Sequence, residues 1–150
     1  MKKTDMRLTN FTDYALRLLI LCAGREGELV TIADAATAYG ISRNHLMKIA
    51  NELVRAGFLQ SVRGRSGGLR LARPASRIKI GAVIRHMERE SPLVECFAAA
   101  SNTCVIAPAC GLKFLFADAL EDFYKRLDKT TLADIARKPL QMRKMLGILQ

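Results

Sequence analysis

The sequence predicts a mainly α-helical protein: a winged helix-turn-helix with a long C-terminal dimerisation helix. Two short amphipathic segments, 31–39 and 42–55, are joined by a glycine-containing turn of helix-turn-helix length. Two apolar segments with a glycine-rich turn between them follow at 58–72, and this pattern predicts a β-hairpin, the wing. Apolar side chains at helical spacing over residues 111–127 predict the long helix.

The first two helices have clear start signals. Thr9 or Thr12 can cap a first helix that ends near Gly24. Thr31 is expected to open the second helix, because a side-chain oxygen at this position can accept a hydrogen bond from the first turn. Asp34, three residues later, adds a weak capping-box signal.

The third helix follows almost at once. Gly40 suits the left-handed position that ends the second helix, and Ser42 can cap the third. Gly57 is expected to close the third helix before the hairpin begins. Beyond Pro74, which ends the wing, apolar residues at helical spacing predict a short helix over 78–89.

The pattern divides the chain into two parts, 1–76 with the winged helix-turn-helix and 77–150 with the cysteine loop and dimerisation helix. The apolar stripe of the long helix is too wide for a small winged helix to cover, which predicts packing against a second subunit. TLADIARKP is expected to form a last short helix with Pro139 just past its end, and 140–150 a ragged apolar tail.

Composition and charge favour a nucleic-acid partner. The chain has 150 residues, half of them apolar, and a formal net charge of +10. Residues 43–73 hold seven basic side chains and one acidic one, around the predicted third helix and wing. A chain this basic is expected to bind a polyanion, nucleic acid before membrane. No long apolar run follows the charged N-terminus, so we expect no signal peptide, no membrane span and a cytoplasmic protein.

The candidate DNA-binding residues lie at the start of the third helix and on the wing. In helix-turn-helix proteins this part of the helix enters the major groove, where Arg can contact guanine and Asn adenine. The wing would reach phosphate or the minor groove. The candidates are Ser42, Arg43, Asn44, His45 and Lys48 on the helix, and Arg63, Arg65 and Ser66 on the wing. A solvated basic face is the alternative, but the coincidence of charge and fold favours double-stranded DNA.

Three of the four cysteines, Cys96, Cys104 and Cys110, are clustered, with seven residues between the first two and five between the last two. Thiolates suit a soft metal or an iron–sulfur cluster. Cys110 precedes the long helix, whose dipole favours a thiolate there. The gaps are wider than the tight spacing of most structural zinc sites. The residues alone leave an iron–sulfur cluster, a structural zinc and idle thiols open. Cys22, on the apolar face of the first helix, is expected in the core.

Asp13 stands early in the first helix, where the helix dipole stabilises a carboxylate, and chemistry alone would not select it as a metal ligand. Nothing in the sequence indicates catalysis. Neither His45 nor His86 neighbours a cysteine, and no Ser/His/Asp arrangement is present. The segment GRSGG lacks the Lys-Ser/Thr of a phosphate-binding loop. The chain is therefore not expected to be an enzyme.

The chain resembles the Rrf-two (Rrf2) family of winged-helix regulators over roughly residues 6–148. The matching pieces are MRLTNFTDYALR, YGISRNHLMKI, VRGRSGGLRLARPASRIKIG, LVEC, ACGLK and TLADI. Taken together, these pieces are highly specific to the family. The resemblance implies a homodimer that binds palindromic operator DNA and represses transcription.

Within the family the chain is most similar to the nitric-oxide-sensing branch. That resemblance implies an iron–sulfur cluster, 4Fe–4S in preference to 2Fe–2S, on Cys96, Cys104 and Cys110, with Asp13 of the other subunit as fourth ligand. It also implies release from DNA when nitric oxide attacks the cluster. The seven-residue gap between the first two cysteines resembles an iron-responsive branch instead. A repressor that senses iron or cluster status is the first alternative, and a zinc-stabilised DNA-binding protein the second.

Overall fold

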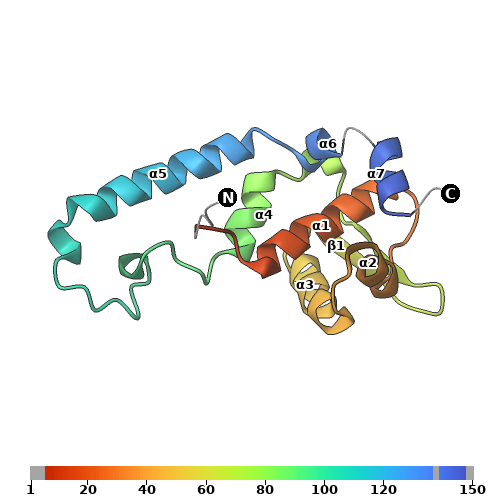
Figure 1. Ribbon diagram of the computed structural model, residues 1–150, viewed down its shortest axis with the longest axis horizontal. Coiled ribbons are helices and arrows are strands. Elements are labelled where there is room, and N and C mark those ends of the chain that lie inside the picture. Colours follow the sequence, from red (N-terminus) through yellow and green to blue (C-terminus); the bar gives the residue numbers. More distant parts are fainter. Residues whose placement is uncertain (1–5, 137–138, 148–150) are drawn as a thin grey trace.

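The computed structural model describes residues 6–136 and 139–147 and has two visibly different parts. A body of short helices and one hairpin carries an arm, residues 91–128, made of the cysteine loop (residues 91–110) and one long helix (Figure 1). The elements are α1 (Asn10–Gly24), α2 (Ile32–Tyr39), α3 (Arg43–Arg55), β1 (Leu59–Val62), β2 (Gly68–Leu71), α4 (Ile80–Met87), α5 (Gly111–Asp128), α6 (Leu132–Ile135) and α7 (Pro139–Met145). The predicted mainly helical winged-helix fold is confirmed.

Local capping explains where α1 and α2 begin. The Thr9 hydroxyl accepts a hydrogen bond from the backbone N–H of Thr12, so Thr9 and not Thr12 caps α1. Thr31 and Asp34 form a complete capping box, each side chain accepting from the other residue's backbone N–H at 3.0 Å. Gly40 ends α2 with φ 64°, the left-handed conformation that glycine adopts at low cost. These sequence predictions are confirmed.

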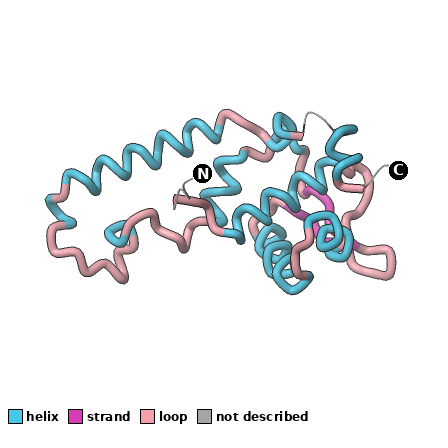
Figure 2. The backbone as a smooth tube through the Cα atoms, in the orientation of Figure 1, coloured by secondary structure: helices cyan, strands magenta, loops and turns pink. Residues whose placement is uncertain are grey.

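The helix-turn-helix and wing follow in the predicted order. The Ser42 hydroxyl accepts from the backbone N–H of His45 at 3.2 Å and caps α3. Strands β1 and β2 pair antiparallel, with Leu59 opposite Leu71, and appear as the short magenta ribbon in Figure 2. Val30 extends this hairpin by a bridge to β2. The hairpin is therefore held against the segment that leads into α2.

One apolar core holds the body together. Leu18 from α1, Leu46 and Leu53 from α3, and Val83 from α4 are fully buried in it. Leu132 of α6 joins the same cluster, so the core contains residues from both sides of the predicted boundary at residue 76. The division into 1–76 and 77–150 stays a prediction. Burying one such leucine stabilises the fold by about 1.5–3 kcal/mol, which makes this core the main source of stability.

Two expectations about helix bounds were wrong. The helix expected over 78–89 is shorter, because the carbonyl oxygen of Ile78 accepts from the N–H of Leu132 at 2.8 Å and α4 begins only at Ile80. Pro139 does not follow the last helix but begins α7, the position where proline's missing N–H costs no hydrogen bond. Residues 140–145 are therefore helical and not a ragged tail, while 148–150 lie outside the described residues.

The arm differs from the body in having almost no core of its own. Helix α5 has no buried residue among its eighteen. Large apolar side chains on it are exposed by between 45 and 61%, namely Leu112, Phe114, Leu115 and Phe123. Within the described ranges no helix is both long and apolar enough to cross a membrane. The arm thus leaves an apolar helix face that no other part of the described ranges covers.

Candidate DNA-binding face and cysteine loop

The first turns of α3 present polar side chains to solvent. Arg43, Asn44 and Lys48 are exposed. None of the three forms an ion pair or a side-chain hydrogen bond with another residue in the described ranges, so their donors are available to a ligand. Ser42 is exposed too, but its hydroxyl already serves as the cap of α3. The structure thus places these four predicted residues at one helix end.

His45 has a structural role beside any contact with DNA. Its ring lies 5.4 Å from the Tyr14 ring in an edge-on arrangement, and 6.3 Å from the Phe11 ring. These contacts fix the start of α3 against the start of α1, and they leave His45 half-buried. Direct contact between His45 and a base stays a prediction.

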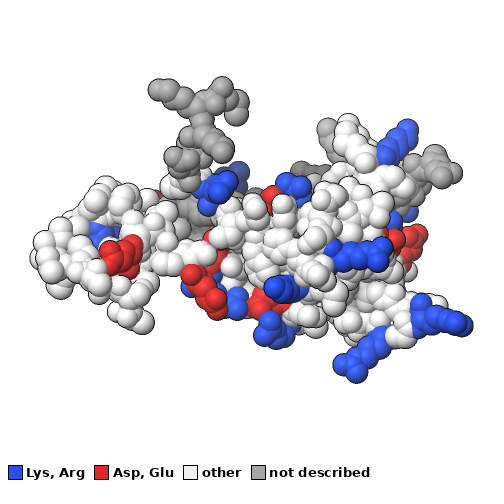
Figure 3. Space-filling view, turned by 60° about the horizontal axis from the view of Figure 1, so that its bottom comes forward, with Lys and Arg blue, Asp and Glu red and all other residues white. Residues whose placement is uncertain are grey.

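The wing tip is basic and exposed. Arg63, Arg65 and Ser66 lie at the turn between β1 and β2 and are all exposed. The turn requires glycine at position 67, because a Cβ atom there would collide with the carbonyl oxygen of Val62. In Figure 3 blue side chains project from the body, whereas the end of the arm is mostly white. The positive charge seen on this face therefore belongs mainly to the body.

The three clustered cysteines all lie in the arm. Cys96 is half-buried, Cys104 is exposed, and Cys110 is the N-cap residue of α5, as predicted; each is a free thiol. Cys22 is buried in the core, also as predicted, and burial raises the pKa of its thiol to about 12. Cys22 therefore stays protonated at neutral pH and is a poor candidate ligand.

Hydrogen bonds join the stretches that carry the first two cysteines. Glu95, which precedes Cys96, accepts from both the backbone N–H and the hydroxyl of Thr103 at 2.6 Å. Thr103 in turn precedes Cys104. These hydrogen bonds, the hydroxyl's first, lower the pKa of the Glu95 carboxyl. Glu95 thus keeps its charge and holds the two ends of the first cysteine interval together.

The described residues of the single chain do not form a finished metal site. Nowhere in ranges 6–136 and 139–147 do three His, Cys, Asp or Glu side chains converge as metal ligands. Asp13 forms a two-pronged ion pair with Arg17, Nη2 to Oδ2 at 2.7 Å and Nε to Oδ1 at 3.3 Å. Three free thiols on an accessible loop nevertheless match the ligands that an iron–sulfur cluster takes.

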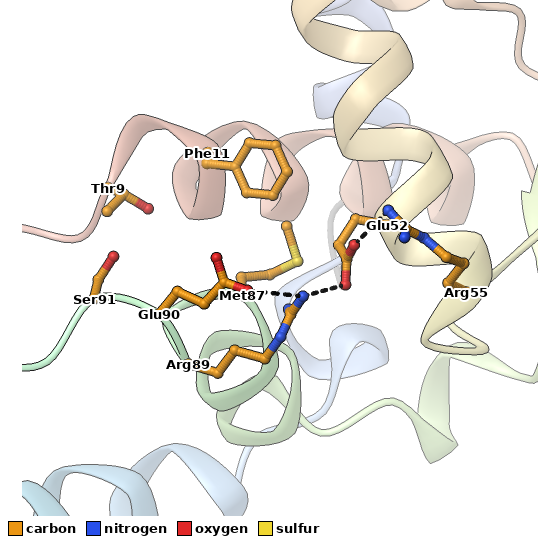
Figure 4. Close-up of a pocket in the computed structure, with 8 residues that line it drawn as sticks. All are labelled: Thr9, Phe11, Glu52, Arg55, Met87, Arg89, Glu90 and Ser91. Atoms are coloured by element: carbon orange, nitrogen blue, oxygen red, sulfur yellow. Dashed lines mark ion pairs between the residues drawn. The ribbon is translucent and has the colours of Figure 1, made fainter. Parts of the chain in front are cut away.

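A buried carboxylate was missed by the sequence reasoning. Glu52 lies on the apolar side of α3 and pairs with Arg55 at 2.9 Å, with His86 at 2.7 Å and with Arg89 at 3.0 Å. Figure 4 shows Arg55 and Arg89 reaching it from two sides, at the edge of a cavity of about 470 Å³. A glutamate between Ile49 and Leu53 on an apolar stripe was the available signal.

Comparison with known proteins identifies the family. The model of the Rrf2 family, described as "Iron-dependent Transcriptional regulator", matches residues 8–138. A protein of Bacillus licheniformis named HTH-type transcriptional regulator NsrR is 47% identical over 95% of this chain and 100% of its own length. The protein of the same name from Geobacillus kaustophilus is 49% identical over 94% of this chain and 97% of its own.

Solved structures share the fold. The oxidized form of Staphylococcus aureus CymR is 29% identical, covers 87% of this chain and 96% of its own, and has a TM-score of 0.67. T. potens IscR is 25% identical, covers 89% and 88%, and has a TM-score of 0.71. These relatives agree with the expectation of a DNA-binding regulator that is not an enzyme. The chain therefore belongs to the Rrf2 family of winged-helix transcriptional regulators.

Proposed function

We propose that the chain is a nitric-oxide-responsive repressor, which binds palindromic operator DNA as an iron–sulfur-loaded homodimer and is released when nitric oxide attacks the cluster. The observation that carries the proposal is the group of three free thiols, Cys96, Cys104 and Cys110, on one loop of a winged-helix regulator. Relatives that carry the name NsrR over nearly the whole length support the same assignment.

The DNA-binding part of the proposal rests on α3 and the wing. Arg43, Asn44 and Lys48 would contact base edges and phosphates of the major groove, and Arg63 and Arg65 phosphates or the minor groove. All five are exposed. A second copy related by twofold symmetry would place two recognition helices about one DNA turn apart, which suits a palindromic site.

The homodimer part rests on α5. An exposed apolar helix face on an otherwise charged protein marks an interaction surface. Phe114 and Leu115 are 59 and 61% exposed, and a second α5 would cover them. Pairing two long helices would also bring the arm of one subunit toward the body of the other.

Cys96, Cys104 and Cys110 would hold the cluster, with Asp13 of the second subunit as fourth ligand. Bound there, a cluster, 4Fe–4S in preference to 2Fe–2S, would supply a centre that reacts with nitric oxide. To bind iron, Asp13 must exchange at least part of its ion pair with Arg17. When Asp13 returns to Arg17, α1 loses its tie to the other subunit's loop. Because α3 packs on α1, the spacing of the two recognition helices then changes.

A repressor that responds to iron or cluster status is the second candidate. The family description, iron-dependent, and the seven-residue interval between Cys96 and Cys104 favour it. The same residues would hold the cluster, but loss of iron would be the signal. The two candidates differ in which chemical releases the DNA.

The test is an anaerobic titration of the purified protein with nitric oxide, followed by visible absorbance and by fluorescence anisotropy of a DNA duplex. The duplex is selected by the protein from a randomised library. We expect charge-transfer absorbance to bleach as the duplex is released. A coloured protein that ignores nitric oxide but releases DNA with an iron chelator supports iron sensing. A colourless protein, prepared anaerobically with iron, contradicts both.

Matched cysteine variants sharpen this test. Cys104→Ala removes an exposed loop thiol and is expected to abolish the visible absorbance. Cys22→Ala removes a sulfur atom from the buried core instead and is expected to keep the visible absorbance. Equal loss in both variants would contradict the assignment of the loop cysteines.

A further inference from the structure

Glu52 is the one charged side chain among the described residues that is buried, with 7% of its surface exposed. Arg55, from its own helix, contacts one carboxylate oxygen, and His86 and Arg89 contact the other. Since a carboxylate only accepts, the His86 Nε2 must donate its hydrogen to Glu52. The hydrogen bond from His86 lowers the pKa of Glu52, with Arg89 and Arg55 contributing, so the carboxylate stays charged.

Two of the three partners of Glu52 lie at the root of the cysteine loop. His86 is in the last turn of α4, and Arg89 lies two residues before the loop starts at Ser91. Glu52 itself lies in the last turns of α3, whose first turn carries the candidate DNA contacts. The carboxylate thus joins the recognition helix directly to the chain segment from which the cysteine loop departs.

The same junction reaches the wing. The ring of His86 lies edge-on to the ring of Phe58 at 6.2 Å. Phe58 directly precedes β1, and the guanidinium carbon of Arg73 lies over the Phe58 ring, 5.2 Å from its centre. A displacement of α4's last turn would therefore move both the recognition helix and the base of the wing.

Stability alone does not account for this arrangement. Replacing a buried ion pair by apolar side chains is often neutral or stabilising, because desolvation offsets the attraction between the charges. What a buried, multiply bonded carboxylate provides is a fixed orientation of the elements it joins. Glu52 has donors from both α3 and the loop root, so it fixes these two segments relative to each other.

We infer that Glu52 is the positioning residue through which the state of the cysteine loop reaches the recognition helix and the wing. The inference rests on the proposed function and adds to the route through Asp13 and α1 a second route of its regulation, through α4. When the loop changes its course, Arg89 and His86 shift with it. Glu52 then keeps Arg55 but loses donors from the loop root, and the orientation of α3 is no longer fixed by α4.

The experiment compares wild type, Glu52→Gln and the control Glu90→Gln in the full-length protein. Glu90 is 86% exposed and pairs with the same Arg89 at 3.8 Å, so the control removes one charge near the same arginine. The affinity for the selected duplex is measured with cluster-loaded and cluster-depleted protein. Regulatory couplings commonly change affinity about 5- to 150-fold. Glu52→Gln is expected to cut the ratio of the two affinities at least about fivefold.

Two further readouts separate positioning from general damage. Visible absorbance and its bleaching by nitric oxide should be unchanged in Glu52→Gln, since Glu52 holds no cluster. Arg89→Gln, which alters a half-exposed side chain, should reduce the same ratio, and the double variant should lose no more than either single variant. If Glu52→Gln does not fold, Arg89→Gln alone tests the inference, because it removes one of the same contacts and keeps Glu52.

A Glu52→Gln protein with an unchanged affinity ratio would overturn the inference, as would equal loss in Glu90→Gln. Additive losses in the double variant would likewise show that Glu52 and Arg89 do not act as a unit. If wild-type affinity does not depend on the cluster at all, the proposed function fails, and the inference fails with it. That outcome is recognised before any variant is made.

Discussion

The body of this protein buries its large apolar side chains, whereas the arm leaves most of its own exposed. The body buries leucines from α1, α3 and α6 in one core, while α5 buries none of its residues. The body also neutralises its buried charge internally, at Glu52. The arm instead exposes Val105 by 91% and Leu115 by 61%. The difference is what the proposed homodimer predicts, in which the body keeps its own core and a second chain covers the arm.

The largest expected effect comes from truncating side chains in the two regions. Leu18→Ala should lower the free energy of unfolding by about 2–5 kcal/mol, because it opens a cavity in the core. Leu115→Ala should lower only the part of the free energy of unfolding that depends on protein concentration, since in the proposed homodimer a second chain covers Leu115. Urea unfolding at two concentrations a hundredfold apart measures both. A Leu115→Ala loss that is independent of concentration would contradict the comparison.

A smaller effect is expected where arm and body meet. A Cβ atom at Gly81 would collide with the carboxylate of Asp128, which Arg85 holds with Nη2 3.0 Å from Oδ2. Gly81→Ala should therefore push α5 from α4 and lower stability by about 1–3 kcal/mol. Gly24→Ala is the matched control, because a Cβ atom there meets nothing within 4 Å. Thermal unfolding compares them, and equal losses would show that the contact at Gly81 is not tight.

The smallest effect is a dependence on pH. The pKa of Glu52 is lower in the folded protein than its ordinary value, so the charged form stabilises the fold. That contribution is present above about pH 4.3 and is lost as pH falls below it through the lowered pKa. Glu52→Gln should flatten the fall of stability in acid. Glu95→Gln, in the exposed loop, should change it far less, and urea midpoints across this range test both.

Local signals predicted the body well. Thr31, Ser42 and Gly40 were found because capping and left-handed turns depend on neighbouring residues. Glu52 was missed because two of its three partners, His86 and Arg89, are 34 or more residues away and only the fold brings them to it. The mutual arrangement of the three loop cysteines was not predictable either, since no local rule fixes side chains on a loop without a core.

The contact of Gly81 with Asp128 makes α5 a lever with a defined pivot. Its eighteen residues extend about 27 Å from that point at 1.5 Å per residue. A rotation of about 5° at the pivot would carry the cysteine end by about 2 Å, given this length. Conversely, a shift of that size at the cysteine end reaches the body as a change of only a few degrees. A movement of the arm about this contact would therefore reach the body as a rotation and not as a translation.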